Sequence, residues 1–173
     1  MRKVTTAIIT GLILAGCGSP AAATVIQPSN PKPVVELSMM DYVRSMAREA
    51  KVKTTIHQLQ RHIGRTWYVF SGNTPAGWDC SGLTMWFYQQ LGKEIPHSAN
   101  KQAHLHGWTK HPVMGDLVLF GYKGSNSFFH AAIYYTPGKV IHAGFRKGTR
   151  TSILDLTSPS VKNLEIRYIH LAQ

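Results

Sequence analysis

The stretch Asp79-Cys80-Ser81-Gly82-Leu83-Thr84-Met85-Trp86 decides the interpretation of this chain, because it places a cysteine at the start of a predicted helix. Apolar residues recur after it at helical spacing, and Gly92 stands where a helix from Cys80 to about Leu91 would end. The positive end of the helix dipole is expected to lower the pKa of the thiol. Cys80 is therefore a candidate nucleophile.

Two histidines downstream could activate this thiol. His130 lies in a β-rich run, where it shares one face with Ala132, while Ala131 and Ile133 take the other. His142 follows in the next β-rich run. A base beside the nucleophile, with a polar group behind it to fix its tautomer, is the arrangement that nucleophilic catalysis requires. Taken singly, each of these residues is more often structural than catalytic.

The order of the predicted elements indicates an α+β fold. Capping signals and apolar spacing predict four helices, at 38–50, 55–63, 80–91 and 98–106. Short β-rich runs between Gly, Pro, Ser and Asn predict five strands, at 116–120, 128–135, 139–143, 151–156 and 165–171. Helices first and strands afterwards predict N-terminal helices packed on one side of an antiparallel sheet.

The N-terminal residues have the layout of an export signal. A basic start and the apolar run Val4–Leu14 precede Leu14-Ala15-Gly16-Cys17, which resembles the lipobox of bacterial lipoproteins. We expect a signal peptide over 1–16, lipidation of Cys17, a Pro-, Ala- and Ser-rich tether over 17–37, and one domain over 38–173. The alternative for the apolar run is a buried N-terminal helix. With Cys17 acylated, the exported chain would contain one free thiol and no internal disulfide.

The chain is strongly basic, with 19 Lys and Arg against 8 Asp and Glu and a formal net charge of +11. Such a surface favours polyanions, which for an exported protein are wall polymers, anionic lipids or acidic peptides of the cell wall. Nucleic acid is the same electrostatic prediction in another compartment, and no nucleic-acid partner is expected here. A basic surface that serves only solubility is the plainer alternative.

From about Ile63 to its C-terminus the sequence resembles the NlpC family of cell-wall cysteine peptidases, which share a papain-like α+β core. Four motifs carry the resemblance: Asp79-Cys80-Ser81-Gly82-Leu83, Gly115-Asp116-Leu117-Val118, His130-Ala131-Ala132-Ile133-Tyr134 and Ile141-His142-Ala143. The order Cys, His, His and the spacings of 50 (130 minus 80) and 12 (142 minus 130) also fit the family.

The resemblance implies a catalytic triad in which Cys80 is the nucleophile, His130 the general base and acid, and His142 the residue that orients His130. The backbone N–H of Cys80, together with the Tyr68 hydroxyl, would stabilise the oxyanion. Tyr68, Asp79 and Ser81 are thus expected on the oxyanion or substrate side, where Asp79 and Ser81 also serve the turn and the helix start. The family usually has a Pro-Tyr pair and a double glycine where this chain has Trp67-Tyr68 and Ser71-Gly72. These differences lie on the substrate side and bear on specificity.

The implied activity is that of an exported, lipid-anchored cysteine endopeptidase that cleaves peptidoglycan stem peptides or cross-bridges through a thioester acyl-enzyme, without a cofactor. In a Gram-negative host it would sit on the outer membrane and face the periplasm. Two alternatives stay open. The same chemistry could serve an amidase, transpeptidase or acyltransferase, or the domain could be a non-catalytic wall-binding lipoprotein.

A cluster of histidines offers a rival zinc site at His97, His104, His106 and His111. The spacing of His104 and His106 would suit two metal ligands on a strand. No cysteine or carboxylate joins them, and this stretch reads as helix and loop, so no metal site is expected.

Overall fold

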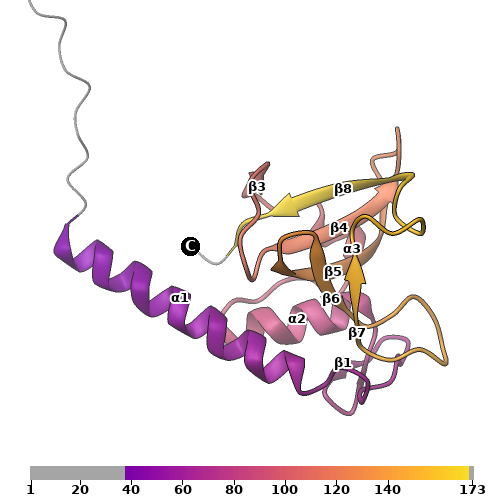
Figure 1. The fold of residues 1–173 in the computed structure, drawn as a ribbon, viewed down its shortest axis with the longest axis horizontal. Helices are drawn as coiled ribbons and strands as arrows, with labels where there is room; N and C mark the ends of the chain where they lie inside the picture. Colours follow the sequence, from indigo (N-terminus) through magenta and orange to yellow (C-terminus); the bar gives the residue numbers. More distant parts are fainter. Residues whose placement is uncertain (1–37, 172–173) are drawn as a thin grey trace, which may run out of the picture. The chain divides into compact units, whose positions relative to one another are not determined.

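The fold is described from a computed structural model, which covers residues 38–171 (Figure 1). The predicted signal peptide, lipidation site and tether, over 1–37, lie outside the described residues. The helices are α1 (Met39–Gln60), α2 (Cys80–Gln90) and α3 (Ala99–Gln102). The strands are β1 (Asn73–Thr74), β2 (Gly77–Trp78), β3 (Trp108–Thr109), β4 (Leu117–Tyr122), β5 (Phe128–Thr136), β6 (Lys139–His142), β7 (Ser152–Asp155) and β8 (Leu164–Ile169).

Six strands form one antiparallel sheet in the order β3-β8-β4-β5-β6-β7 (Figure 1). A separate small hairpin is formed by β1 and β2. Consecutive strands from β4 to β7 are neighbours, whereas β8 returns to pair with β4. The predicted α+β class and the antiparallel sheet are therefore confirmed. Each of the five strands predicted from the sequence is present within about two residues of its expected bounds.

The sheet separates two apolar clusters, because alternate side chains of each strand point to opposite faces. On the helix side, Leu119 and Ile133 pack with α2 residues Leu83 and Phe87. On the other side, a smaller cluster gathers around Phe120. The further members of this second cluster are Val118, Ala132, Val140 and Val161.

A β-bulge in β5 lies directly before His130. Phe120 is opposite His130 and Gly121 is opposite Phe128, so the intervening Phe129 has no partner on β4. The extra residue lets Phe128 and Ala131 both join the helix-side cluster. His130 instead turns to the opposite face, with its ring centroid 5.5 Å from that of Phe120.

The two predicted helices at 38–50 and 55–63 are a single helix, α1. No glycine or proline interrupts the intervening residues, and the hydroxyls of Thr54 and Thr55 donate hydrogen bonds to the carbonyls of Ala50 and Lys51 within the helix. Only its C-terminal half is packed on the domain. The buried residues are Val52, Thr55, Ile56 and Leu59.

The helix predicted over 98–106 is also wrong in length, because α3 ends at Gln102. The chain after α3 runs to the edge of the sheet instead of continuing the helix. Gly107 has a φ of 105°, accepts a hydrogen bond from the His170 N–H, and leads into β3 beside β8. In the described residues, no helix combines the length and the apolar character needed to cross a membrane.

Candidate active site

The start of α2 is fixed by Asp79, which caps the helix. Its Oδ1 accepts hydrogen bonds from the Gly82 N–H at 2.7 Å and the Ser81 hydroxyl at 3.0 Å, and its Oδ2 accepts from the Ser71 N–H at 3.0 Å. The carboxylate thereby ties the preceding loop to the first helical turn. Asp79 and Ser81 thus hold the helix start, and Cys80 is its first residue.

Gly82 lets the loop before the helix approach this turn closely. A Cβ on Gly82 would lie 1.9 Å from the carbonyl oxygen of Gly72, and a Cβ on Gly72 would lie 2.4 Å from that of Gly77. No side chain fits at either position without moving the backbone. The Gly72 carbonyl also accepts a hydrogen bond from the Asp79 N–H at 3.0 Å. These contacts set the position of Cys80.

His130 and His142 form a hydrogen-bonded pair that continues to a third residue. Nε2 of His130 is 3.0 Å from Nδ1 of His142, and Nε2 of His142 is 3.0 Å from the hydroxyl of Ser152. The sheet brings them together, because His142 on β6 is directly opposite Ser152 on β7. Ser152 was not predicted as a site residue, since nothing in its local sequence sets it apart from other strand serines.

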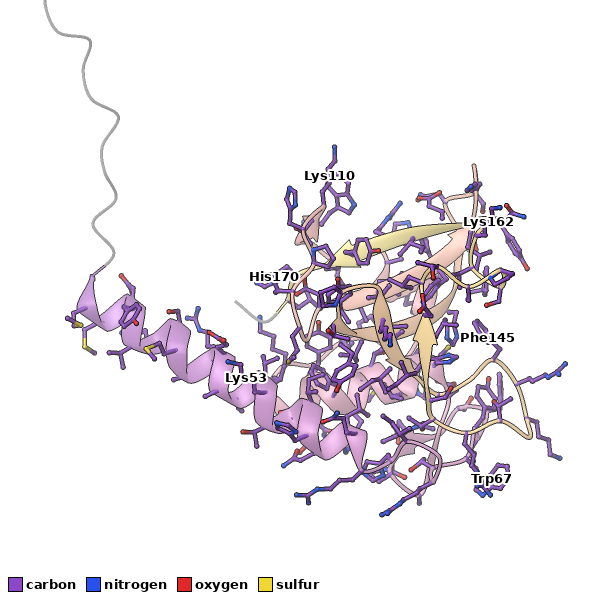
Figure 2. All side chains as sticks on the ribbon, viewed as in Figure 1. Lys53, Trp67, Lys110, Phe145, Lys162 and His170 are labelled. Atoms are coloured by element: carbon purple, nitrogen blue, oxygen red, sulfur yellow. The ribbon has the colours of Figure 1, made fainter. Side chains whose placement is uncertain are left out.

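Phe145 covers the imidazole of His130. The two rings are stacked, with centroids 4.2 Å apart and planes at 30°, and the Phe145 ring meets that of His142 edge-on at 5.1 Å. Figure 2 labels Phe145, on the loop after β6. Phe145 is 44% exposed, while His130 and His142 are only 2% and 4% exposed. This aromatic side chain therefore separates the histidine pair from water, a role that has no signal in the local sequence.

Burial keeps both histidines neutral. Desolvation lowers the pKa of His130 well below its ordinary value, and the nearby His142 lowers it further. Desolvation lowers the pKa of His142 from 6.5 to about 4. Near neutral pH the pair is therefore uncharged, which leaves one ring nitrogen of His130 free to accept a proton.

The expectation that the helix N-terminus lowers the pKa of Cys80 is wrong in direction. Burial raises the pKa of the thiol, and the negative charge of Asp79 also raises it. The backbone N–H groups of Ala131, Ser81 and Cys80 itself act in the opposite sense, without outweighing the loss of water. In the free protein, Cys80 is thus a thiol beside a neutral histidine pair.

Cys80 contacts β5 at Ala131, the residue after His130, and has no direct hydrogen bond to His130 in the described residues. The N–H that acts on the Cys80 sulfur belongs to Ala131, the residue after His130. Among residues 38–171, His130 is hydrogen-bonded to His142 and not to the thiol. Tyr68 belongs to the same region, because burial raises the pKa of its phenol and the nearby groups of Cys80 and Asp79 raise it further. Its hydroxyl therefore keeps its proton.

Two histidines of the rival zinc hypothesis, His97 and His104, have separate partners. His97 Nε2 lies 3.0 Å from the Asp79 carboxylate, and His104 Nδ1 lies 2.7 Å from the Asn100 carbonyl. In the part of the chain that the structure describes, no group of three or more His, Cys, Asp or Glu side chains could hold a metal ion. His97 thus joins the cap of the Cys80 helix, a contact that the sequence did not reveal.

The lowered histidine pKa values predict that the protein loses stability in acid. In the unfolded chain His142 takes up a proton as the pH falls through about 6.5, whereas the folded protein takes it up only near pH 4. The contribution of His142 to the free energy of unfolding is therefore fully present above pH 6.5. It is lost as the pH falls towards 4, which lowers the free energy of unfolding by about 3 kcal/mol. Urea unfolding followed by tryptophan fluorescence at pH 7 and near pH 4 measures this difference.

The control for this prediction is His142→Gln, which removes the titrating group and keeps a side chain able to bond His130 and Ser152. This variant should lose less stability than the wild type over the same pH interval. His130 acts in the same direction and remains in both proteins. An equal loss in the two proteins would show that His142 does not titrate as described.

The sequence and the fold were compared with known proteins. The family model described as NlpC/P60 matches residues 64–168. A probable endopeptidase of Mycobacterium tuberculosis is 40% identical over 82 residues, which is 44% of this chain and 19% of that protein. The murein DD-endopeptidase MepH of Escherichia coli is 34% identical over 123 residues, which is 64% of this chain and 44% of that protein.

The fold is similar to the crystal structure of an NlpC/P60 family protein from Bacillus cereus. The TM-score is 0.64 at 25% sequence identity, over 70% of this chain and 40% of the other. The chain spans less than half the length of each of these three relatives.

Proposed function

Because the chain belongs to the NlpC/P60 family, we propose that it is an exported cysteine endopeptidase that hydrolyses peptidoglycan stem peptides or cross-bridges. The observation that carries the proposal is the buried His130–His142 pair beside a cysteine at a helix N-terminus. The relatives named as endopeptidases support the reaction class. Their names extend to this chain only as far as the shared domain.

The proposed reaction assigns one proton path to the histidine pair. If His142 Nε2–H donates to Ser152, its Nδ1 accepts from His130 Nε2–H, and His130 Nδ1 is left with a free lone pair. That nitrogen takes the Cys80 proton as the sulfur attacks the carbonyl carbon. In the opposite tautomer, His130 Nδ1 would carry a proton and could not act as the base. In the active tautomer Ser152 thus accepts the His142 Nε2–H, which makes it a positioning residue.

Acylation and hydrolysis then follow in two halves. The tetrahedral intermediate collapses when His130 returns the proton to the leaving amine, and a thioester to Cys80 remains. Water attacks this thioester with His130 as base, which releases the carboxylic acid and restores the thiol. The oxyanion of each half accepts hydrogen bonds from the Cys80 N–H and the Tyr68 hydroxyl. The contact between Cys80 and His130 is expected to tighten when substrate binds.

Digestion of defined muropeptides, followed by mass spectrometry, tests the proposal. An endopeptidase should release fragments cut at a peptide bond within the stem or between stems, with one water added per cut. An amidase would separate the stem from the sugar instead. A transpeptidase or acyltransferase would give products joined to an added amine or other acceptor. Absence of any product from a folded protein would contradict the proposed function.

The second candidate function is a wall-binding lipoprotein without activity. Its support is the state of Cys80, whose raised pKa leaves little thiolate in the free protein. A binding protein would retain peptidoglycan in a pull-down assay and turn over no muropeptide. The same digestion therefore separates the two candidates.

We also propose that Cys17 anchors the protein to a membrane by a lipid, as its sequence context indicates. A Cys17→Ser variant should lose all incorporation of a fatty-acid analogue during metabolic labelling, because the modified atom is the cysteine sulfur. The Cys80→Ala variant is the matched control, since it removes the other cysteine and should label like the wild type. Equal labelling of the Cys17→Ser variant and the wild type would end the lipoprotein hypothesis.

A further inference from the structure

The first turns of α1 expose an apolar surface. All residues from Met39 to Lys51 are exposed to solvent. Five large apolar side chains of this segment are each more than half exposed: Met39, Met40, Tyr42, Val43 and Met46. In Figure 2 the turns that precede Lys53 stand clear of the strands and of α2. An isolated apolar side chain on a surface is ordinary, whereas five on adjoining turns of one helix call for an explanation.

This apolar surface and the packed face of α1 lie on opposite sides of the helix. With about 100° between successive residues, Met39, Val43 and Met46 fall within one narrow arc. The buried residues Val52 and Leu59 fall roughly half a turn away from the centre of that arc, and Ile56 lies about 110° from it. The exposed apolar arc therefore cannot be covered by the domain on which the C-terminal half of α1 packs. It faces away from that domain.

Cationic side chains border the exposed arc. Lys53 lies next to Met46 at one edge of the arc, Arg44 and Lys51 lie on the other side beyond Met40, and Arg48 lies opposite the arc. Asp41 and Glu49 pair with Arg44 at 3.3 Å and Lys53 at 2.6 Å. Within the described residues, Arg48 and Lys51 form no ion pair, and residues 39–53 have four cationic against two acidic side chains. An apolar arc with cationic borders is the pattern of helices that lie in a membrane interface.

We propose that the N-terminal half of α1 binds the surface of an anionic lipid bilayer, with Met39, Val43 and Met46 in the interface. Charge complementarity favours lipid over a second copy of this chain, since a copy would bring the same cations against one another. The net charge of +11 acts in the same direction. Because the arc faces away from the domain, the active site stays on the aqueous side.

Spin labels at two adjacent positions test this orientation. Val43→Cys places a label in the apolar arc, and Ser45→Cys places one on the opposite side of the same turn. Both are made in the full-length chain in a Cys80→Ala background, which without an added cysteine gives the background signal. The probes are vesicles of phosphatidylethanolamine with and without phosphatidylglycerol. Collisions with oxygen, which dissolves in lipid, and with a water-soluble nickel complex are measured for each label.

In vesicles with phosphatidylglycerol, the label at position 43 should lose collisions with nickel and keep those with oxygen. The label at position 45 should keep its collisions with nickel. Omission of phosphatidylglycerol, or high salt, should reduce the contrast. Equal nickel collisions at the two positions would overturn the proposal. Loss of both kinds of collision at position 43 would also overturn it, because that result signifies burial against protein.

This proposal is independent of the peptidase reaction and of lipidation. The background variant has no nucleophile, so the result does not depend on turnover. Fatty-acid labelling of Cys17 reports the anchor separately. A lipidated protein whose labels at positions 43 and 45 behave alike would retain the anchor and refute the helix contact.

Discussion

Cys80→Ala is expected to abolish the hydrolysis of muropeptides, with a fall in kcat of roughly 10⁴-fold or more. The proposed mechanism has no other group that can form the thioester. His130 cannot replace it by activating a water molecule, because the substrate carbonyl is positioned for attack by the Cys80 sulfur. Muropeptide digestion with timed mass spectrometry measures the effect. A wild type and a Cys80→Ala variant that cleave at equal rates would refute covalent catalysis by this residue.

The same substitution should leave the fold intact, because Cys80 is the first residue of α2 and its side chain makes no hydrogen bond to another side chain in the described residues. Alanine also suits a helix. The matched control is Ser81→Ala at the next position, which removes one hydrogen bond to the Asp79 cap and no reacting atom. This control should keep most activity and lose some stability. It therefore distinguishes activity lost through a weaker helix cap from activity lost with the nucleophile.

His130→Gln is expected to lower kcat by about 10² to 10⁴-fold, the usual contribution of a general base, whereas His142→Gln should keep measurable activity. His130 must accept the Cys80 proton and return it to the leaving amine, which an amide cannot do. His142 only orients His130, and a glutamine can accept a hydrogen bond from His130 through its oxygen while it donates one to Ser152 through its nitrogen. Kinetics of the two variants on one stem peptide decide the matter.

The dependence of activity on pH is an independent test of the roles of His130 and His142. Activity requires a neutral His130, and its pKa lies well below the ordinary value, so the acid limb should fall below pH 6.5. That limb belongs to the coupled histidine pair and not to either residue alone. Equal and complete loss of activity in His130→Gln and His142→Gln, with folding intact, would contradict the assignment of His130 as the base and His142 as the residue that orients it.

The strands of the sheet were predictable because alternation and turn residues are local signals. The runs that became β4, β5 and β6 were identified with their bounds nearly correct. The long α1 was predicted as two helices, at 38–50 and 55–63, whereas the structure continues one helix through the residues between them. The bulge at Phe129 also has no local signal. It follows from the pairing of β5 with β4, which only the assembled sheet defines.

Cys80, His130 and His142 of the candidate site were named from the motif and its spacing, but the residues around them were not. Ser152 is more than seventy residues from Cys80 in the sequence, and only the pairing of β6 with β7 puts it beside His142. Phe145 stacks on His130 because the loop after β6 folds back over the strand. The pKa of Cys80 depends on how deeply the helix start is buried, which a helix-dipole argument does not include.

The raised pKa of Cys80 has a consequence for the choice of chemical probes and inhibitors. Simple alkylating agents such as iodoacetamide react with the thiolate, so they should label the free protein slowly near neutral pH, and faster as the pH rises. An electrophile built on a stem peptide would instead bring its own carbonyl to His130 and Cys80 and trigger proton transfer only after it has bound. Selectivity for this enzyme over other cellular thiols would then come from recognition of the peptide and not from the warhead. Comparison of the labelling rates of the two reagents across pH measures this difference.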